Sequence, residues 1–382
     1  MLKETVWDGE DLYSAPDIIT AKDWDANGVE AVFYSALPYK GKQTKVFAYL
    51  GFPENASSDS PVPAVVCVPG GGGTAFDEWV RIWNKRGYAA IALDIEGTLP
   101  EGKYPNRPTH PYSGPDRKNV FEDIDLPVKD QWMYHAVADV VLANSLMRSF
   151  PQVDSDNVGL TGVSWGGVIT GIVMGVDERF KYAVPVYGCG FLYESDNYFG
   201  QSYKMMGNER AEKCKKYWDP ATYLHKSEIP SLWVNGTNDA HFYLDIYNKS
   251  YRATSGNRTI CIKLNIGHSH QVAWRTEEVY AFADSVVKGL PRLTKVLDCG
   301  RDNRDVWCDF ESTNKIVLAE LLYCKDVNDL GNAEWEKKEA NINYVNQKIE
   351  CVLPKNVEGY FFNLTDSRGL IVSSCFTGKE KL

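Results

Sequence analysis

A serine in the middle of the chain lies in a short motif whose residue types could build a nucleophile. The run Gly162-Val163-Ser164-Trp165-Gly166 follows a strand predicted over 155–161 and precedes a small-residue helix predicted over 167–174. At such a sharp strand-to-helix turn the serine is strained with its hydroxyl exposed, and the glycines leave room for the backbone crossing. A serine hydroxyl is a weak nucleophile at neutral pH, so the motif predicts catalysis only if a base and an orienting acid accompany it. The alternative is a purely structural turn serine.

An acid and a base follow in the sequence. Asp239 comes after an apolar strand that begins at Ser231, and His268 comes after a strand that begins at Ile260. The reactive crevice of an open α/β sheet lies outside the carboxyl ends of its strands, so Ser, Asp and His at three strand ends predict a catalytic triad. We expect Ser164 to attack the substrate, His268 to take its proton, and Asp239 to fix the histidine tautomer.

Both partners of the serine have a neighbour of the same type. His270 follows His268 by two residues, and Asp245 lies close to Asp239 but within a predicted helix. His268 and Asp239 are preferred because each comes directly after its strand. His270 is then expected to support the site from behind or to contact the substrate.

A glycine run after another buried strand could bind a developing oxyanion. The strand predicted over 63–68 leads into Pro69 and then Gly70–Gly73. Acyl transfer needs N–H donors aimed at the oxyanion, and glycines let the backbone approach it closely. One donor should be the N–H of Trp165, and the other should come from the glycine run, with Gly71, Gly72 and Gly73 as candidates. A phosphate-binding loop is the alternative, but it would need a Gly-Lys-Ser/Thr sequence that this segment lacks.

Two further segments could line the entrance to this site. The stretch 97–125 is long, irregular and rich in Pro and Gly, which is typical either of a functional loop or of a surface excursion. The strand predicted over 184–190 leads into an aromatic segment, 191–203, which could stack on a sugar or simply pack the wall. The candidate substrate contacts from these segments are Tyr112 and Tyr187, with Tyr104 and His110 as further loop residues.

The arrangement of strands and helices predicts the fold. Two alternating segments, 29–35 and 45–50, favour antiparallel edge strands, and the order strand 63–68, helix 76–86, strand 88–93 favours a parallel sheet covered by helices. The residue spacing between 129 and 148 predicts an amphipathic helix that flanks this sheet.

Three units follow from this organisation. We expect an N-terminal strap over 1–28, an α/β-hydrolase catalytic domain over 29–290 and a C-terminal antiparallel β-sandwich over 291–382. The sandwich is predicted from short strands with no helices between them, at 315–323, 340–345, 348–353 and 360–365.

Four motifs together resemble those of a known superfamily. The segments PGGGG, GVSWGG, NGTND and GHSH are similar to the α/β-hydrolase superfamily, and in particular to the group of acetylxylan esterases, dienelactone hydrolases and prolyl-oligopeptidase catalytic domains. The resemblance covers roughly residues 30 to 290. It implies hydrolysis of an ester or amide through an acyl-enzyme, without a metal or organic cofactor.

Composition excludes some partners. The net charge of −10 disfavours binding to nucleic acid and to anionic lipid, and no apolar run reaches membrane-spanning length. The nine cysteines include no CxxC pair, which favours free thiols in a reducing compartment, with a Cys299–Cys308 bridge as the minor alternative. We expect a cytoplasmic protein unless a leader has been removed. The sequence leaves open whether the chain forms a homo-oligomer.

These observations favour a serine carboxylesterase, with a small-molecule or oligosaccharide ester, such as an acetylated carbohydrate, as its substrate. A serine peptidase of the prolyl oligopeptidase type uses the same triad and is the first alternative. A non-catalytic binding protein on an inherited hydrolase scaffold is the second.

Overall fold

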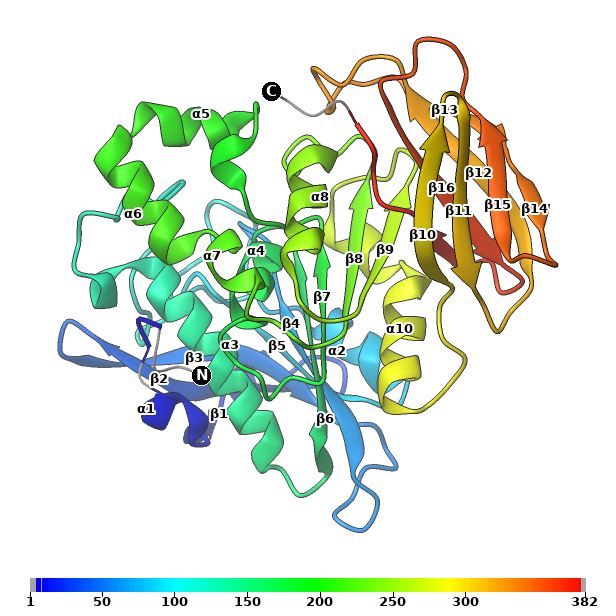
Figure 1. Ribbon diagram of the computed structural model, residues 1–382. Helices are drawn as coiled ribbons and strands as arrows, with labels where there is room; N and C mark the ends of the chain where they lie inside the picture. Colours follow the sequence, from blue (N-terminus) through cyan, green and yellow to red (C-terminus); the bar gives the residue numbers. More distant parts are fainter. Residues whose placement is uncertain (1–4, 8, 379–382) are drawn as a thin grey trace.

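A nine-stranded sheet forms the centre of the computed structural model, which describes residues 5–7 and 9–378 (Figure 1). Its strand order is β1-β2-β3-β5-β4-β6-β7-β8-β9. The pairs from β4–β5 to β8–β9 are parallel, whereas β1, β2 and β3 add to one side in antiparallel fashion. The strands are β1 (Ile18–Thr20), β2 (Glu30–Tyr39), β3 (Lys42–Gly51), β4 (Val62–Val68), β5 (Ala89–Leu93), β6 (Val153–Val163), β7 (Tyr182–Val186), β8 (Ser231–Gly236) and β9 (Arg258–Lys263).

Helices cover both faces of this sheet. The step from β4 to β5 runs in the opposite direction to the steps from β5 to β6 and from β6 to β7, so right-handed crossovers place α2 on one face and α3 and α4 on the other. α10 shares the face of α2, because the Trp83 and Tyr280 rings lie 4.8 Å apart. The helices are α1 (Gly9–Tyr13), α2 (Asp77–Asn84), α3 (Trp132–Ser149), α4 (Trp165–Val173), α5 (Tyr198–Met205), α6 (Asn208–Trp218), α7 (Ala221–Leu224), α8 (Leu244–Ala253), α9 (His270–Trp274) and α10 (Glu277–Val287).

The long helix α3 differs from its prediction. An amphipathic helix was expected, but every residue from Trp132 to Met147 is buried. The N-terminal segment covers the side that would otherwise face water: the Trp7 ring stacks on Tyr134 at 5.9 Å, and the Ser145 hydroxyl donates to the Leu12 carbonyl at 2.6 Å. The segment expected to be an irregular strap therefore contains a helix, an edge strand and part of the hydrophobic core.

The C-terminal part is an antiparallel β-sandwich of two four-stranded sheets, ordered β10-β11-β15-β14 and β13-β12-β16-β17. Apolar side chains from both sheets fill the space between them. Cys299 on β10 and Cys308 on β11 pair directly across the ladder, and both are free thiols, so the minor alternative of a bridge is not realised here. The strands are β10 (Lys295–Asp302), β11 (Asp305–Glu311), β12 (Ile316–Cys324), β13 (Glu336–Glu339), β14 (Asn341–Asn343), β15 (Lys348–Val352), β16 (Gly359–Asp366) and β17 (Ile371–Ser373).

The sandwich closes one edge of the large sheet, and the two units lie side by side (Figure 1). The N–H of Ile262 in the outer strand β9 donates to the Ser373 hydroxyl at 2.7 Å, and its carbonyl accepts from the Asn363 side chain at 2.9 Å. Leu322 and Phe361 of the sandwich join the same hydrophobic core as the large sheet. An exposed edge strand is a template for aggregation, and these side chains satisfy it without adding a tenth strand.

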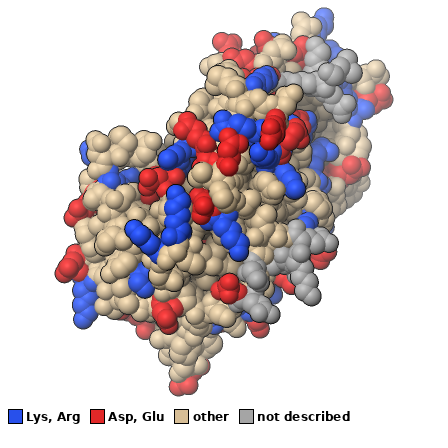
Figure 2. All heavy atoms as spheres, turned by 90° about the vertical axis from the view of Figure 1, so that its left-hand side faces the viewer, with Lys and Arg blue, Asp and Glu red and all other residues tan. Residues whose placement is uncertain are grey.

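The face that carries α6 shows acidic and basic side chains interspersed, without a broad field of one sign (Figure 2). On α6 itself, Lys213 pairs with Glu209 at 2.9 Å and Lys215 pairs with Glu212 at 2.7 Å. Within the described residues, no helix combines the length and the hydrophobicity that crossing a membrane requires.

Candidate active site

The serine motif forms a strained turn between β6 and α4. Ser164 has φ 57° and ψ −118°, a conformation that L-residues adopt rarely. A Cβ atom on Gly162 would overlap the backbone of Gly166, and one on Gly166 would overlap the carbonyl of Val68. Both glycines are therefore required by the close crossing of β4, β6 and α4, as the motif predicted.

The expected acid and base lie beside this serine. His268 Nε2 is 2.8 Å from Ser164 Oγ, and His268 Nδ1 is 2.6 Å from Asp239 Oδ2. The second oxygen of Asp239 accepts the backbone N–H groups of His241 and Phe242, each at 2.9 Å. These bonds fix the carboxylate and leave one oxygen for the imidazole. The rival Asp245 instead lies in the first turn of α8 and accepts the N–H of Ile246.

Aromatic rings hold the imidazole of His268 in place. The Tyr187 ring lies 4.8 Å from it, and the Tyr187 hydroxyl donates to the Ser269 carbonyl at 3.1 Å. Tyr187 is 0% exposed, so the prediction that it contacts the substrate is wrong. Its buried ring supports the histidine instead.

An exposed histidine that the sequence analysis did not select completes this side of the site. The His241 ring lies 4.9 Å from that of His268. Partial desolvation of the His241 imidazole and the neighbouring His268 lower the pKa of His241, which favours a neutral ring at the rim. Its place two residues after Asp239, in the same loop, was the available signal.

The glycine loop has most of its N–H groups already bonded. Gly70 donates to His270 Nε2 at 2.8 Å, Gly72 donates to Glu96 Oε1 at 2.9 Å, and Gly73 donates to the Gly70 carbonyl at 2.9 Å. Among the described residues, only the N–H of Gly71 in this loop has no acceptor. The prediction that Gly72 and Gly73 donate to the oxyanion is therefore wrong, because their N–H groups point at other acceptors.

The second expected donor lies across from this loop. Trp165 is the first residue of α4, and N–H groups in the first turn of a helix have no intrahelical acceptor. A Cβ on Gly70 would lie 3.0 Å from the Cβ of Ser164, so the loop passes directly beside the serine. The N–H groups of Gly71 and Trp165 are therefore the two candidate donors around Ser164.

The Nε2 atom of His270 is already used in a hydrogen bond within the protein. Its Nε2 accepts the Gly70 N–H, and its ring lies 4.7 Å from that of Phe76. Burial lowers the pKa of the His270 imidazole to about 4, with smaller effects from His268 and Arg107, so the ring is neutral near pH 7. Of the two predicted roles, support of the site is the one that this geometry fits.

The long loop contributes to the site at some positions and not at others. The Tyr104 ring lies over Gly72 and is 65% exposed. Tyr112 instead packs on Phe33 at 5.5 Å and bonds to the backbone of Lys45. It lies at β2 and β3, and β3 is three strands, or about 14 Å, from the serine strand β6. Its predicted substrate contact is corrected for that reason.

Charged residues of the same region reach the glycine loop, and sequence reasoning missed them. Arg107 donates to the carbonyls of Gly72 and Gly73, the latter at 3.1 Å. Arg117 pairs with Glu96 at 2.8 Å and stacks 4.8 Å from the Trp165 ring. Nothing in their spacing marks them, because their partners are distant in the sequence.

The aromatic segment forms a wall more than a platform. Phe199 and Phe121 pack on the Trp165 ring at 5.6 and 5.7 Å. Tyr203 is buried against Phe121 at 6.1 Å, whereas Tyr198 is largely exposed. The packing alternative from the sequence therefore describes most of this segment.

Comparisons with known proteins agree with this architecture. A family model described as the prolyl oligopeptidase family matches residues 122–287, and one described as acetyl xylan esterase (AXE1) matches residues 15–203. The solved acetyl xylan esterase from Paenibacillus sp. R4 superposes with a TM-score of 0.59 at 16% identity, covering 73% of this chain and 92% of that one. The Pyrococcus horikoshii acylaminoacyl peptidase superposes with a TM-score of 0.51 at 16% identity, covering 72% and 44%. The chain has the α/β-hydrolase fold.

Among curated proteins the chain is similar to both an esterase and a peptidase. It is 27% identical over 211 residues to the acetyl esterase Axe7A of Xylanibacter ruminicola, which covers 52% of this chain and 46% of that protein. It is 26% identical over 207 residues to the uncharacterized peptidase YuxL of Bacillus subtilis, which covers 51% and 28%. The match spans less than half the length of each of these relatives.

Proposed function

We propose that this chain is a serine hydrolase that cleaves a carboxylic ester through an acyl-enzyme, with an acetylated carbohydrate as the expected substrate class. One observation carries the proposal: a strained, partly exposed Ser164 lies 2.8 Å from an imidazole whose other nitrogen lies 2.6 Å from a carboxylate. A serine, imidazole and carboxylate in this order remove the serine proton as the hydroxyl attacks. A serine with a purely structural role in a turn does not require these partners.

The reaction follows from the positions of these groups. Ser164 Oγ attacks the acyl carbon while His268 Nε2 takes its proton, and Asp239 stabilises the imidazolium that forms. The N–H groups of Trp165 and Gly71 bind the oxyanion. His268 then protonates the leaving alcohol, and a water molecule activated by the same imidazole releases the acyl group.

Esterase and peptidase activities share this chemistry, so other observations must rank them. The match to the acetyl xylan esterase model includes both the glycine loop and the serine turn, which favours an ester substrate. The match to the prolyl oligopeptidase model includes the serine, acid and base, which keeps a peptidase as the second candidate.

A fluorophosphonate probe and a substrate panel test the proposal. Wild type should be labelled by the probe and Ser164→Ala should not, because the probe reacts only with an activated serine. The panel contains acetylated xylo-oligosaccharide, p-nitrophenyl acetate, a feruloyl ester and an aminoacyl amide. We expect acetyl esters to be hydrolysed fastest, and Ser164→Ala to lose at least about 10³-fold in kcat.

Each contrary outcome points to a different alternative. Faster cleavage of the amide than of every ester would replace the esterase by a peptidase. No labelling and no turnover by folded wild type would replace both by a binding protein on a hydrolase scaffold.

A further inference from the structure

The glycine loop beside Ser164 is held by side chains from elsewhere in the chain. Two of its N–H groups bond to those side chains, and a third bonds to a carbonyl within the loop. We infer that Glu96 and His270 are positioning residues that aim the Gly71 N–H as the oxyanion donor opposite Trp165. This inference rests on the proposed hydrolase function and adds to it the residues that orient the donor.

The direction of the Gly71 N–H follows from the peptide plane that contains it. The Gly70 carbonyl accepts the N–H of Gly73 at 2.9 Å. In a trans peptide the carbonyl and the following N–H point in opposite directions, so the Gly71 N–H must point away from Gly73. Whatever fixes the Gly70 carbonyl therefore also fixes the donor.

Glu96 fixes the next peptide, between Gly71 and Gly72. One of its oxygens, Oε1, accepts both the Gly72 N–H at 2.9 Å and Arg117 Nη1 at 2.8 Å. The guanidinium of Arg117 lies against Gly71, which keeps the shared carboxylate in register with the loop. An acceptor that is bonded twice has little freedom to turn, so the Gly71–Gly72 peptide is clamped.

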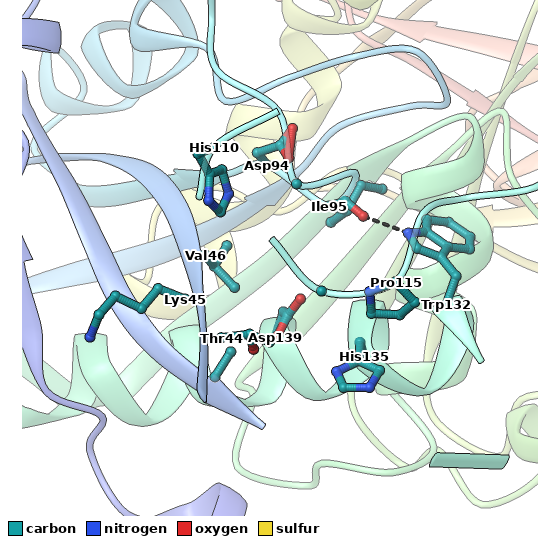
Figure 3. A pocket seen from close by; sticks show the side chains of 13 residues that line it. Thr44, Lys45, Val46, Asp94, Ile95, His110, Pro115, Trp132, His135 and Asp139 are labelled. Carbon is teal, nitrogen blue, oxygen red and sulfur yellow. Dashed lines mark hydrogen bonds between the residues drawn. The ribbon is translucent and has the colours of Figure 1, made fainter. Parts of the chain in front are cut away.

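The turn that carries Glu96 is itself anchored below. Asp94 is buried at the end of β5 and accepts the N–H of Glu96 at 2.9 Å, the N–H of Thr98 at 2.8 Å and the Thr98 hydroxyl at 2.9 Å. Figure 3 shows Asp94 at the wall of a small cavity of about 20 Å³, next to Ile95, whose carbonyl accepts from Trp132 at 2.6 Å. Asp94 and Ile95, which line this cavity, are both buried. The support of Glu96 therefore comes from the interior of the fold.

His270 and Arg107 fix the rest of the loop. His270 Nε2 accepts the Gly70 N–H, which requires a neutral ring, and its low pKa keeps the ring neutral. Arg107 donates to the carbonyls of Gly72 and Gly73. Residues 96, 107 and 270 thus converge on four consecutive glycines, and the Gly71 N–H is the one left for a ligand.

Steady-state kinetics on p-nitrophenyl acetate with Glu96→Ala, Glu96→Gln and the matched control Glu101→Ala tests the inference. Glu101 is an exposed carboxylate of the same loop region. Glu96→Ala should lower kcat about 10²-fold while KM changes little, because the donor acts in the transition state. Glu96→Gln keeps an oxygen acceptor for the Gly72 N–H and should recover much of the loss. His270→Ala should resemble Glu96→Ala.

Inhibition by a trifluoromethyl ketone separates positioning from general damage. This inhibitor forms a tetrahedral adduct on the serine and engages the same donors, so its Ki should rise in Glu96→Ala by the factor that kcat/KM falls. Circular dichroism confirms that each variant is folded.

Either of two results for Glu96→Ala would overturn the inference while leaving the hydrolase standing: a wild-type kcat in the folded variant, or an unchanged Ki beside a lowered kcat. Absence of turnover and of fluorophosphonate labelling in wild type would instead contradict the proposed function itself. A loss in Glu101→Ala as large as that in Glu96→Ala would also overturn the inference, because the effect would not be specific to the clamp.

Discussion

The serine turn and the glycine loop lie side by side at the end of the sheet, and they are held in opposite ways. In the serine turn, Gly162 faces the backbone of Gly166, and Gly166 faces the backbone of Val68, so the shape results from packing of main chain on main chain. In the glycine loop, Gly71 and Gly72 face the side chains of Arg117 and Tyr104, and the shape results from hydrogen bonds to side chains.

This difference means that the serine turn depends on rigid backbone packing, whereas the glycine loop depends on side chains. The turn needs small residues at the right spacing after β6, with the backbone of β4 against them. The loop needs Glu96, Arg107 and His270 to arrive from elsewhere, so its geometry is sensitive to changes far away in the chain.

Among substitutions of the glycines in these two features, the largest effect is expected for Gly166→Ala in the serine turn. Its Cβ would overlap the Val68 carbonyl, and neither β4 nor α4 can move without disturbing the sheet. We expect a destabilisation of about 3 kcal/mol and a loss of kcat of at least about 10²-fold, because the nucleophile is displaced. Urea denaturation and kinetics on p-nitrophenyl acetate measure both.

Gly114→Ala is the control, since a Cβ there comes no closer than 3.9 Å to His135. Wild-type stability in Gly166→Ala would show that the turn yields as easily as a side-chain contact does. The contrast between the two features would then fail.

The same contrast explains which parts of the site could be predicted. Ser164 directly follows β6, and Asp239 and His268 lie in the loops that leave β8 and β9. Buried strands with polar exits can be recognised from the sequence alone. Glu96 and Arg107 lie in a polar loop and resemble surface residues until the fold brings the glycines to them. Which N–H groups of Gly71, Gly72 and Gly73 are bonded within the protein depends on those partners. The sequence therefore could not show which of the three glycines is the oxyanion donor.

The fold shows the same division. The strands β2 to β9 and the helices α2, α3 and α4 were predicted because their apolar patterns are strong, whereas β1, β10, β11, β13 and β17 were missed. β10 is mostly exposed and polar, and its pairing is set by β11. The full burial of α3 was missed because its covering segment, with Trp7, lies over a hundred residues away in the sequence.

A smaller effect is expected at the anchor of the glycine loop, where Asp94→Asn should change the pH dependence of stability. Burial raises the pKa of the Asp94 carboxyl to about 7. A folded pKa above the unfolded one adds stability at low pH, and that stability is lost as the pH rises through about 7. Asparagine keeps an oxygen for the two N–H groups and cannot ionise. The variant should therefore gain on wild type between pH 5 and pH 9, by on the order of 2 kcal/mol.

The surroundings of Asp94 offer little to offset its charge. The cavity in Figure 3 is also lined by Lys45, His110, His135 and Asp139. Burial lowers the pKa of His110 to about 4 and also lowers the pKa of His135, while it raises the pKa of Asp139. The charge of Asp94 adds to the raised pKa of Asp139, and the charge of Glu96 adds to the raised pKa of Asp94. Of the described residues, Lys45 is the one cation that lines the cavity, and its amine lies 3.3 Å from the Ser35 hydroxyl.

Unfolding in urea at several pH values, with Asp116→Asn as an exposed control from the nearby loop, measures the Asp94 effect. Parallel pH profiles for wild type and Asp94→Asn would mean that the turn under Glu96 carries no ionisation cost. The glycine loop would then be supported without the strain that the buried carboxyl implies.

The smallest effect is expected for Gly71→Ala, which repeats the alanine substitution of the serine turn in the glycine loop. The new Cβ would meet the end of the Arg117 side chain, which can rotate away, rather than a backbone carbonyl. Loosening Arg117 removes one of the two bonds on Glu96 Oε1 and leaves the bond from the Gly72 N–H. We expect stability to change by less than about 1 kcal/mol and kcat to fall by about tenfold. Damage equal to that of Gly166→Ala would show that the loop is as rigid as the turn, because a contact with a mobile guanidinium should yield and one with the sheet backbone should not.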